Sequence, residues 1–174
     1  MNDTSSPTET PFWRFSLNLY RQPGVSEACI ALQDRCGVDV NLLLFLFWLA
    51  SDDRQLSAAD VKLLDDNVRD WRNLTIVPIR DARRKLKEAA TLVEPARQEA
   101  FRNKVKAVEL EAERLQQEAL YDFSRSGPLG QVAPPAAAAR ANIAAYQSVL
   151  DVSFPDQATG ALLGAFDAAV SRSA

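Results

Sequence analysis

Apolar residues recur every three or four positions along most of this chain, in segments separated by short polar or proline-containing breaks. The most apolar segment is residues 40–50, in which no polar residue interrupts from Leu42 to Ala50. It is too apolar for a surface element and too short to cross a bilayer, which needs roughly 20 apolar residues. Asp39 is placed to cap its first turn. The sequence therefore predicts a buried central helix over residues 40–50.

The same periodicity predicts further helices around this one. Gly37 is placed to end one of them in a left-handed conformation. Ser57 with Asp60 is typical of a capping box at the start of another. A break is expected over residues 73–77, after which Pro78 would restart the helix. The predicted core helices span residues 11–22, 25–36, 40–50, 58–71 and 78–93.

Residues 96–122 form a predicted long amphipathic helix. Its apolar residues step by four and three, and nearly every residue between them is charged or Gln. A narrow apolar seam of this kind is typical of packing against one or two other helices. It would also allow a homo-oligomer to form through this helix. The seam residues are Phe101, Val105, Val108, Ala112, Leu115 and Ala119.

Composition divides the chain into four parts. We expect a disordered tail at residues 1–10, a helical core domain at 11–125, a Pro- and Gly-containing linker at 126–135, and an Ala-rich helical region at 136–174. No two segments show the period-two alternation of paired strands. The predicted fold class is all-α: a compact bundle of about five core helices with a long amphipathic helix and a weakly defined helical C-terminal region.

The overall composition is that of an ordinary globular protein. Its 174 residues are 47% hydrophobic and 25% charged, a length that fits one domain. The net charge of -3 does not indicate binding to nucleic acid or to an anionic membrane. The chain has no His, which excludes a Ser-His-Asp triad and a His-ligated metal. An enzyme is therefore less expected than a binding protein, and no cofactor or metal is predicted.

Cys29 and Cys36 lie seven residues apart on one predicted helix. At ~1.5 Å per residue they are roughly 10 Å apart, whereas a disulfide needs Cα atoms within about 7 Å. They cannot pair with each other while helical. We interpret them as small buried apolar residues, with a redox or metal-binding role as the alternative.

The amino-terminal residues do not resemble an export signal. Residues 1–10 contain no basic residue, and no apolar core follows them. Since the apolar segment 40–50 is too short to span a bilayer, we expect a cytoplasmic protein without a membrane span.

A series of short strings also carries a family resemblance. In order along the chain they are Phe12-Trp13, Pro23-Gly24-Val25, Gly37-Val38-Asp39-Val40-Asn41, Trp71-Arg72 and Pro78-Ile79-Arg80. Over roughly residues 11–120 the chain resembles a family of uncharacterised proteobacterial proteins, classed as a domain of unknown function. The resemblance implies a bacterial, soluble, cytoplasmic protein and carries no assigned activity.

Positive charge is concentrated between Arg69 and Lys87, where seven Lys or Arg residues stand against two Asp residues. Such a face can bind another protein or a phosphate-bearing partner, whereas nucleic acid is less expected because no recognised motif accompanies it. The candidate binding residues are Trp71, Arg72, Arg80, Arg83, Arg84 and Lys87. The alternative is a solvated face whose arginines pair with nearby acids. Such acids include Asp60, Asp65, Asp66 and Glu88.

Other polar and aromatic sets have simpler interpretations. Asp39 and Asn41 beside the apolar helix would line a pocket, but a cap at Asp39 is favoured, and Ser57 is likewise assigned to structural capping. Asp66 and Asp70 share a helix face, which alone is weak evidence for Mg²⁺.

The sequence therefore favours a non-enzymatic protein-binding or regulatory module that uses the basic helical face. The alternative function is binding of a small apolar ligand or lipid intermediate, in a pocket against helix 40–50 that the aromatic residues help to enclose.

Overall fold

A computed structural model describes residues 9–88 and 93–171. The predicted tail falls almost entirely outside these ranges. The mostly helical fold is confirmed. The helices are α1 (Pro11–Tyr20), α2 (Val25–Cys36), α3 (Val40–Ser51), α4 (Ala58–Trp71), η1 (Arg72–Ile76), α5 (Val77–Glu88), α6 (Pro95–Arg125), α7 (Pro135–Leu150) and α8 (Asp156–Ser171).

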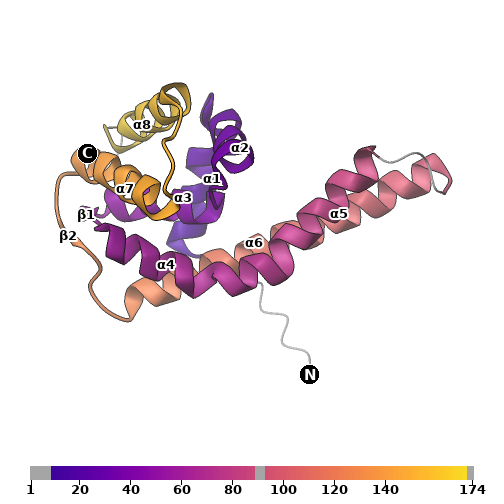
Figure 1. The fold of residues 1–174 in the computed structure, drawn as a ribbon, viewed down its shortest axis with the longest axis horizontal. Coiled ribbons are helices and arrows are strands. Elements are labelled where there is room, and N and C mark those ends of the chain that lie inside the picture. The colour runs from indigo at the N-terminus through magenta and orange to yellow at the C-terminus, as the bar shows by residue number, and fades with distance from the viewer. Residues whose placement is uncertain (1–8, 89–92, 172–174) are drawn as a thin grey trace.

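The molecule has a body of packed helices and a projecting arm (Figure 1). In the arm, α5 and the first half of α6 lie side by side and extend away from the body. Every residue of α5, and every residue of α6 from 95 to 108, is at least partly exposed to solvent. We call residues 77–88 and 95–108 the hairpin arm.

Helix α3 lies at the centre of the body. Asn41 to Phe47, Leu49 and Ala50 are buried, whereas Trp48 is partly exposed. The helix packs mainly against α7, α1 and α6, while α4 packs against α7. The apolar segment of the sequence is thus the core helix, with α7 between it and most of α4.

The C-terminal helices are better defined than the sequence suggested. Leu162 and Phe166 of α8 and Tyr146 of α7 are fully buried in the same core as α3. Asn142 of α7 donates to the carbonyl of Leu46 at 3.0 Å. The small alanines that gave these helices thin apolar faces, such as the buried Ala138 and Ala139, let their backbones approach the body closely.

The expected break at residues 73–77 is wrong, because the chain stays helical from Ala58 to Glu88. The η1 segment is a π-helical turn in which the N–H of Val77 donates to the carbonyl of Arg72, five residues earlier. Pro78 has no N–H to donate, and a widened turn accommodates the missing α-helical bond. The proline therefore marks a change of helix type rather than an end.

A small sheet joins the linker to the body, which corrects the expectation that no strands pair. β1 (Arg54–Gln55) pairs antiparallel with β2 (Gln131–Val132). Two residues per strand are too few to show alternation in a sequence. Gly130 precedes β2 at φ +66°, and a Cβ there would lie 2.3 Å from the carbonyl oxygen of Gln55, so the close approach requires glycine.

Candidate functional site

Two arginines of the predicted basic face make ion pairs inside the molecule. Arg80 Nε donates to Glu109 Oε1 at 3.0 Å, and Arg80 Nη2 donates to Glu113 Oε1 at 2.6 Å. Arg83 Nη2 also donates to Glu109 Oε1, at 3.2 Å. These pairs cross from α5 to α6, where the sequence suggested acids on or near the same helix. Arg80 and Arg83 therefore hold the hairpin together.

The two glutamates of this cluster have opposite pKa shifts. Burial acts to raise the pKa of Glu109, but hydrogen bonds from Arg83 and Arg80 bring it below its ordinary value. Burial raises the pKa of Glu113 above its ordinary value, and Arg80 offsets only part of that rise. Glu109, which is 5% exposed, is therefore the stable counter-ion of the two arginines.

A second buried ion network lies where the arm joins the body. Arg72 Nη1 donates to Asp39 Oδ2 at 2.9 Å and to Asp65 Oδ1 at 2.8 Å. Gln116 Nε2 donates to the same Asp39 oxygen at 2.6 Å. Burial acts to lower the pKa of Arg72, but the two carboxylates raise it above its ordinary value. Arg72 thus links α3, α4 and α6 as a permanently charged centre.

Both residues assigned to capping lie at helix starts. Asp39 Oδ1 accepts the N–H of Asn41 at 2.9 Å and begins α3. Ser57 Oγ accepts the N–H of Asp60 at 3.2 Å, while Asp60 Oδ2 accepts the N–H of Ser57 at 2.9 Å. Asp39 therefore has two roles, because it is also the counter-ion of Arg72.

The other candidate binding residues lie nearer the surface. Trp71 is 40% exposed, and its indole N–H donates to the carbonyl of Ala112 at 3.0 Å. Arg84 pairs with Asp34 of α2 at 2.9 Å, with both side chains well exposed. Lys87 is exposed near the end of α5. Partner binding by this set stays a prediction, and Arg84 and Lys87 are the charged members best placed for it.

The apolar seam of α6 packs against the rest of the chain only in part: Ala112 is buried and Val105 is half-buried, whereas the other seam residues are exposed. Phe101, Val108 and Leu115 are 57%, 56% and 39% exposed. The buried side of the helix is mostly polar and includes Glu109, Gln116 and Gln117. The sequence indicated an apolar stripe correctly, but the polar side of the helix is the one that meets the rest of the chain.

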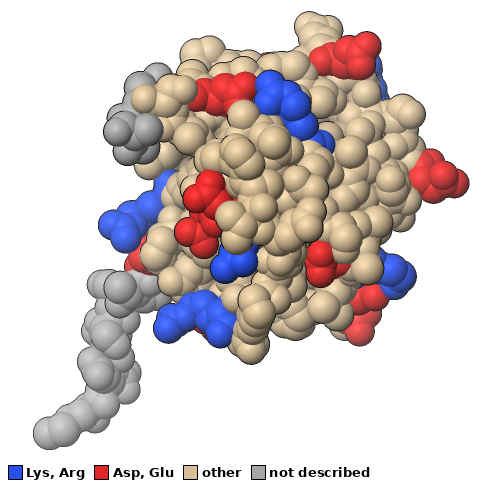
Figure 2. All heavy atoms as spheres, turned by 90° about the vertical axis from the view of Figure 1, so that its left-hand side faces the viewer, with Lys and Arg blue, Asp and Glu red and all other residues tan. Residues whose placement is uncertain are grey.

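Positive charge gathers at the outer part of the arm. Residues 83–106 contain eight Lys or Arg residues and three Glu residues. The exposed cations are Lys85, Lys87, Arg97, Lys104 and Lys106. Figure 2 shows the opposite end of the molecule, where acidic and basic side chains are scattered among uncharged ones. The arm therefore differs from that end in its concentration of positive charge.

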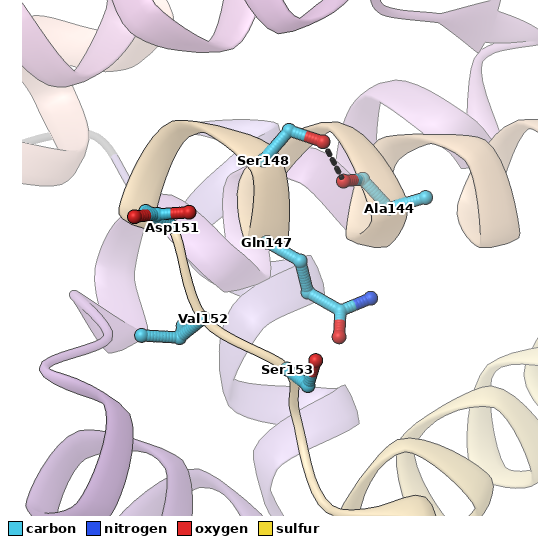
Figure 3. Close-up of a pocket in the computed structure, with 6 residues that line it drawn as sticks. All are labelled: Ala144, Gln147, Ser148, Asp151, Val152 and Ser153. Atoms are coloured by element: carbon cyan, nitrogen blue, oxygen red, sulfur yellow. Dashed lines mark hydrogen bonds between the residues drawn. The ribbon is translucent and has the colours of Figure 1, made fainter.

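Two surface hollows lie on the body. The larger, of about 400 Å³, is lined at the end of α7 by Gln147, Asp151 and Ser153 among others (Figure 3). The Gln147 amide oxygen accepts the N–H of Phe154 at 2.6 Å, so it supports the loop. The hollow contains one carboxylate and lacks the paired groups that acid–base catalysis uses.

The smaller hollow, of about 220 Å³, lies against the end of α3 between Trp48, Tyr121 and Leu129. It is where the apolar-ligand hypothesis placed a pocket. Its volume is below the roughly 300–1,000 Å³ usual for small-molecule sites. The structure therefore gives this alternative little support.

The described residues also bear on metal binding and on membrane insertion. Within residues 9–88 and 93–171, no group of three or more Cys, Asp or Glu side chains is arranged to hold a metal ion. Asp66 pairs instead with Lys62 and Arg69, and both cysteines are free thiols. In the same described ranges, no helix has both the length and the apolar character of a membrane span.

Comparison with known proteins gives one result. A family model described as "Protein of unknown function (DUF2390)" matches residues 11–120. Neither the curated proteins nor the solved structures contain a match to this chain. The matched range contains the hairpin arm and both buried ion networks.

Proposed function

Since the chain belongs to the DUF2390 family, whose description assigns no activity, we propose from its own structure that it is a cytoplasmic, non-enzymatic protein-binding module. The hairpin arm is the docking element. The observation that carries the proposal is the exposed apolar seam on α6. An apolar helix face left open to water is costly, and such faces mark interaction sites.

The shape of the arm supports the same function. α6 is 31 residues long, and its first half extends from the body beside α5 (Figure 1). A partner can therefore reach the seam without displacing the core. The ion pairs of Arg80 and Arg83 to Glu109 hold the two helices together before a partner arrives, which lowers the entropy cost of docking.

The chemistry of the arm defines the partner. The seam matches an apolar stripe on a helix of another protein, the mode in which amphipathic helices dock. The exposed Lys104 and Arg97 beside the seam match acidic residues along that helix. Of the predicted basic face, Arg84 and Lys87 extend this positive surface, whereas the other arginines serve the fold.

A photo-cross-linking residue placed at Val108 of the full chain tests the proposal in cells. Asn103 is the matched control, because it is exposed on the same helix and lies away from the seam. We expect a protein adduct of defined mass from position 108 and none from position 103. Equal labelling from both positions, or no adduct at 108, would overturn the proposal.

The basic extension of the arm is tested by a charge reversal. Arg84→Glu with Lys87→Glu should weaken the adduct at position 108 while leaving the fold intact, because both side chains are exposed. Unchanged adduct yield would remove these two residues from the binding surface.

A further inference from the structure

We propose that the partner of the hairpin arm is a second copy of this chain, packed antiparallel along the α6 seam. This inference rests on the proposed function and names its partner. Three observations carry it: the spacing of the seam, the charges on its open flank, and the coverage of its other flank by α5 and the body.

The seam has an unbroken heptad spacing. Phe101, Val108 and Leu115 follow one another at intervals of seven, and Val105 and Ala112 alternate with them at steps of four and three. This is the a/d pattern of two helices that pack along their length. Phe101, Val108 and Leu115 of this register are exposed, whereas Val105 is half-buried and Ala112 is buried.

Antiparallel packing of two identical seams brings the apolar residues of the two arms together. If Val105 lies opposite Val108 of the second copy, then Phe101 lies opposite Ala112 of that copy. The twofold symmetry repeats each contact, as in most homodimers. Ala112 is itself only 6% exposed, and its carbonyl accepts the indole N–H of Trp71. The Phe ring, which is 57% exposed in the single chain, would therefore lie against this part of the surface beside the 40% exposed Trp71.

The charges beside the seam change sign along the helix. Arg97 and Lys104 lie on one flank of its outer half, and Glu111 and Glu118 continue the same flank toward the body at intervals of seven. All four are on the solvent side of the seam, and within the chain both glutamates pair with Arg114. In an antiparallel pair this flank meets itself, so the basic half faces the acidic half of the other copy.

The opposite flank excludes the parallel arrangement. It contains Arg102, Glu109 and Gln116, and the last two are 5% and 1% exposed. Parallel coiled coils pair one flank of each helix with the other flank of its partner. α5 and the body already cover Glu109 and Gln116. The open flank can therefore contact only the equivalent open flank of the second copy, which requires antiparallel helices.

The test compares two glutamate substitutions by sedimentation velocity on the full chain. Val108 and Leu110 are exposed to similar extents, at 56% and 52%, but only Val108 is on the seam. We expect the wild type to sediment as two chains. Val108→Glu should raise the dimer dissociation constant at least about tenfold, and Leu110→Glu should leave it unchanged. Helical circular dichroism of all three shows that the fold is retained.

A charge exchange tests the orientation. Lys104→Glu should weaken the dimer, and adding Glu111→Lys to it should restore the dimer, because the two positions face each other between copies. They lie seven residues apart on one helix, so the rescue has no explanation within a single chain. Failure of the rescue would overturn the antiparallel arrangement.

The outcomes separate this inference from the proposed function. A wild type that sediments as one chain at all concentrations, or equal behaviour of the two glutamate variants, overturns the homodimer. If position 108 then still gives an adduct with a different protein, the proposed docking function stands. An adduct of two copies of this chain supports both.

Discussion

Replacing Arg72 with Met would leave Asp39 and Asp65 without the cation that they share. Their side chains are only 5% and 6% exposed. Removing one partner from a buried ion pair costs about 3–5 kcal/mol, because the other charge stays buried and uncompensated. In the variant, Asp39 keeps the hydrogen bond from Gln116, and Asp65 keeps its ion pair with Arg69. We therefore expect the lower end of that range, about 3 kcal/mol, which is a large part of the 5–15 kcal/mol stability of a typical domain.

Urea unfolding followed by circular dichroism measures this loss. Arg102→Met is the control, since the Arg102 side chain has a similar exposed fraction, 19% against 18% for Arg72, but pairs with a Glu99 that is 55% exposed. That substitution should cost much less stability than Arg72→Met, because the glutamate that it leaves unpaired is exposed to water. If the two variants lose the same stability, or if Arg72→Met loses less than about 1 kcal/mol, the buried network does not stabilise the fold as argued.

A second substitution identifies the cause of the loss. In the Arg72→Met background, Asp65→Asn removes one of the two buried charges that have lost their shared cation. The double variant should therefore lose less unfolding free energy than the two single variants lose in sum. Additive losses would mean that the cost comes from lost packing around the Arg72 side chain and not from buried charge.

Three further predictions concern other parts of the chain. Because two arginines hold the pKa of Glu109 below its ordinary value against the effect of burial, its stabilising contribution is present at neutral pH and is lost as the pH falls through that lowered pKa. Glu109→Gln should thus destabilise the protein at pH 7, and a pH series of urea unfolding should show the difference from wild type vanishing in acid. Leu74 is 79% exposed, so Leu74→Ala should change stability by less than about 0.5 kcal/mol. Deleting Leu74 removes the π-helical turn and rotates α5 by about 100°, which should lower the urea midpoint strongly; a midpoint near that of wild type would contradict the role of the turn. Burial raises the pKa of the Cys29 thiol to about 12, so an alkylating reagent at pH 8 should modify the half-buried Cys36 and reach Cys29 only after unfolding, as peptide mass spectrometry would detect.

Features set by neighbouring residues were predictable from the sequence. The bounds of α2, from Val25 to Cys36, follow from a Gly on each side of a periodic segment. The start of α3 follows from Asp39 and the start of α4 from Ser57 with Asp60. Each of these signals acts within about one helical turn, so the sequence alone contains the cause.

Features set by distant residues were not predictable. Arg80 and Glu109 are 29 positions apart, and they meet only because α5 and α6 pack side by side. The buried side of α6 is polar because Glu109 and Gln116 meet charged groups of other helices, so an apolar stripe alone did not show which side faces inward. At Pro78 a missing N–H usually ends a helix, and only the π-helical turn before it explains why this one continues.

The central claim is that two copies of the chain meet antiparallel along α6, and a distance between spin labels at position 97 of each copy tests it directly. Arg97 is exposed, at 87% of its side chain, and Cys36→Ser would leave the introduced cysteine as the reactive thiol. In an antiparallel pair whose twofold axis lies midway between Val105 and Val108, the two labels are 19 residues of helix rise apart. Their separation is then about 30 Å with the spacing between the helices included. A separation near 10 Å, as in a parallel pair, or the absence of dipolar coupling between labels, would contradict the account.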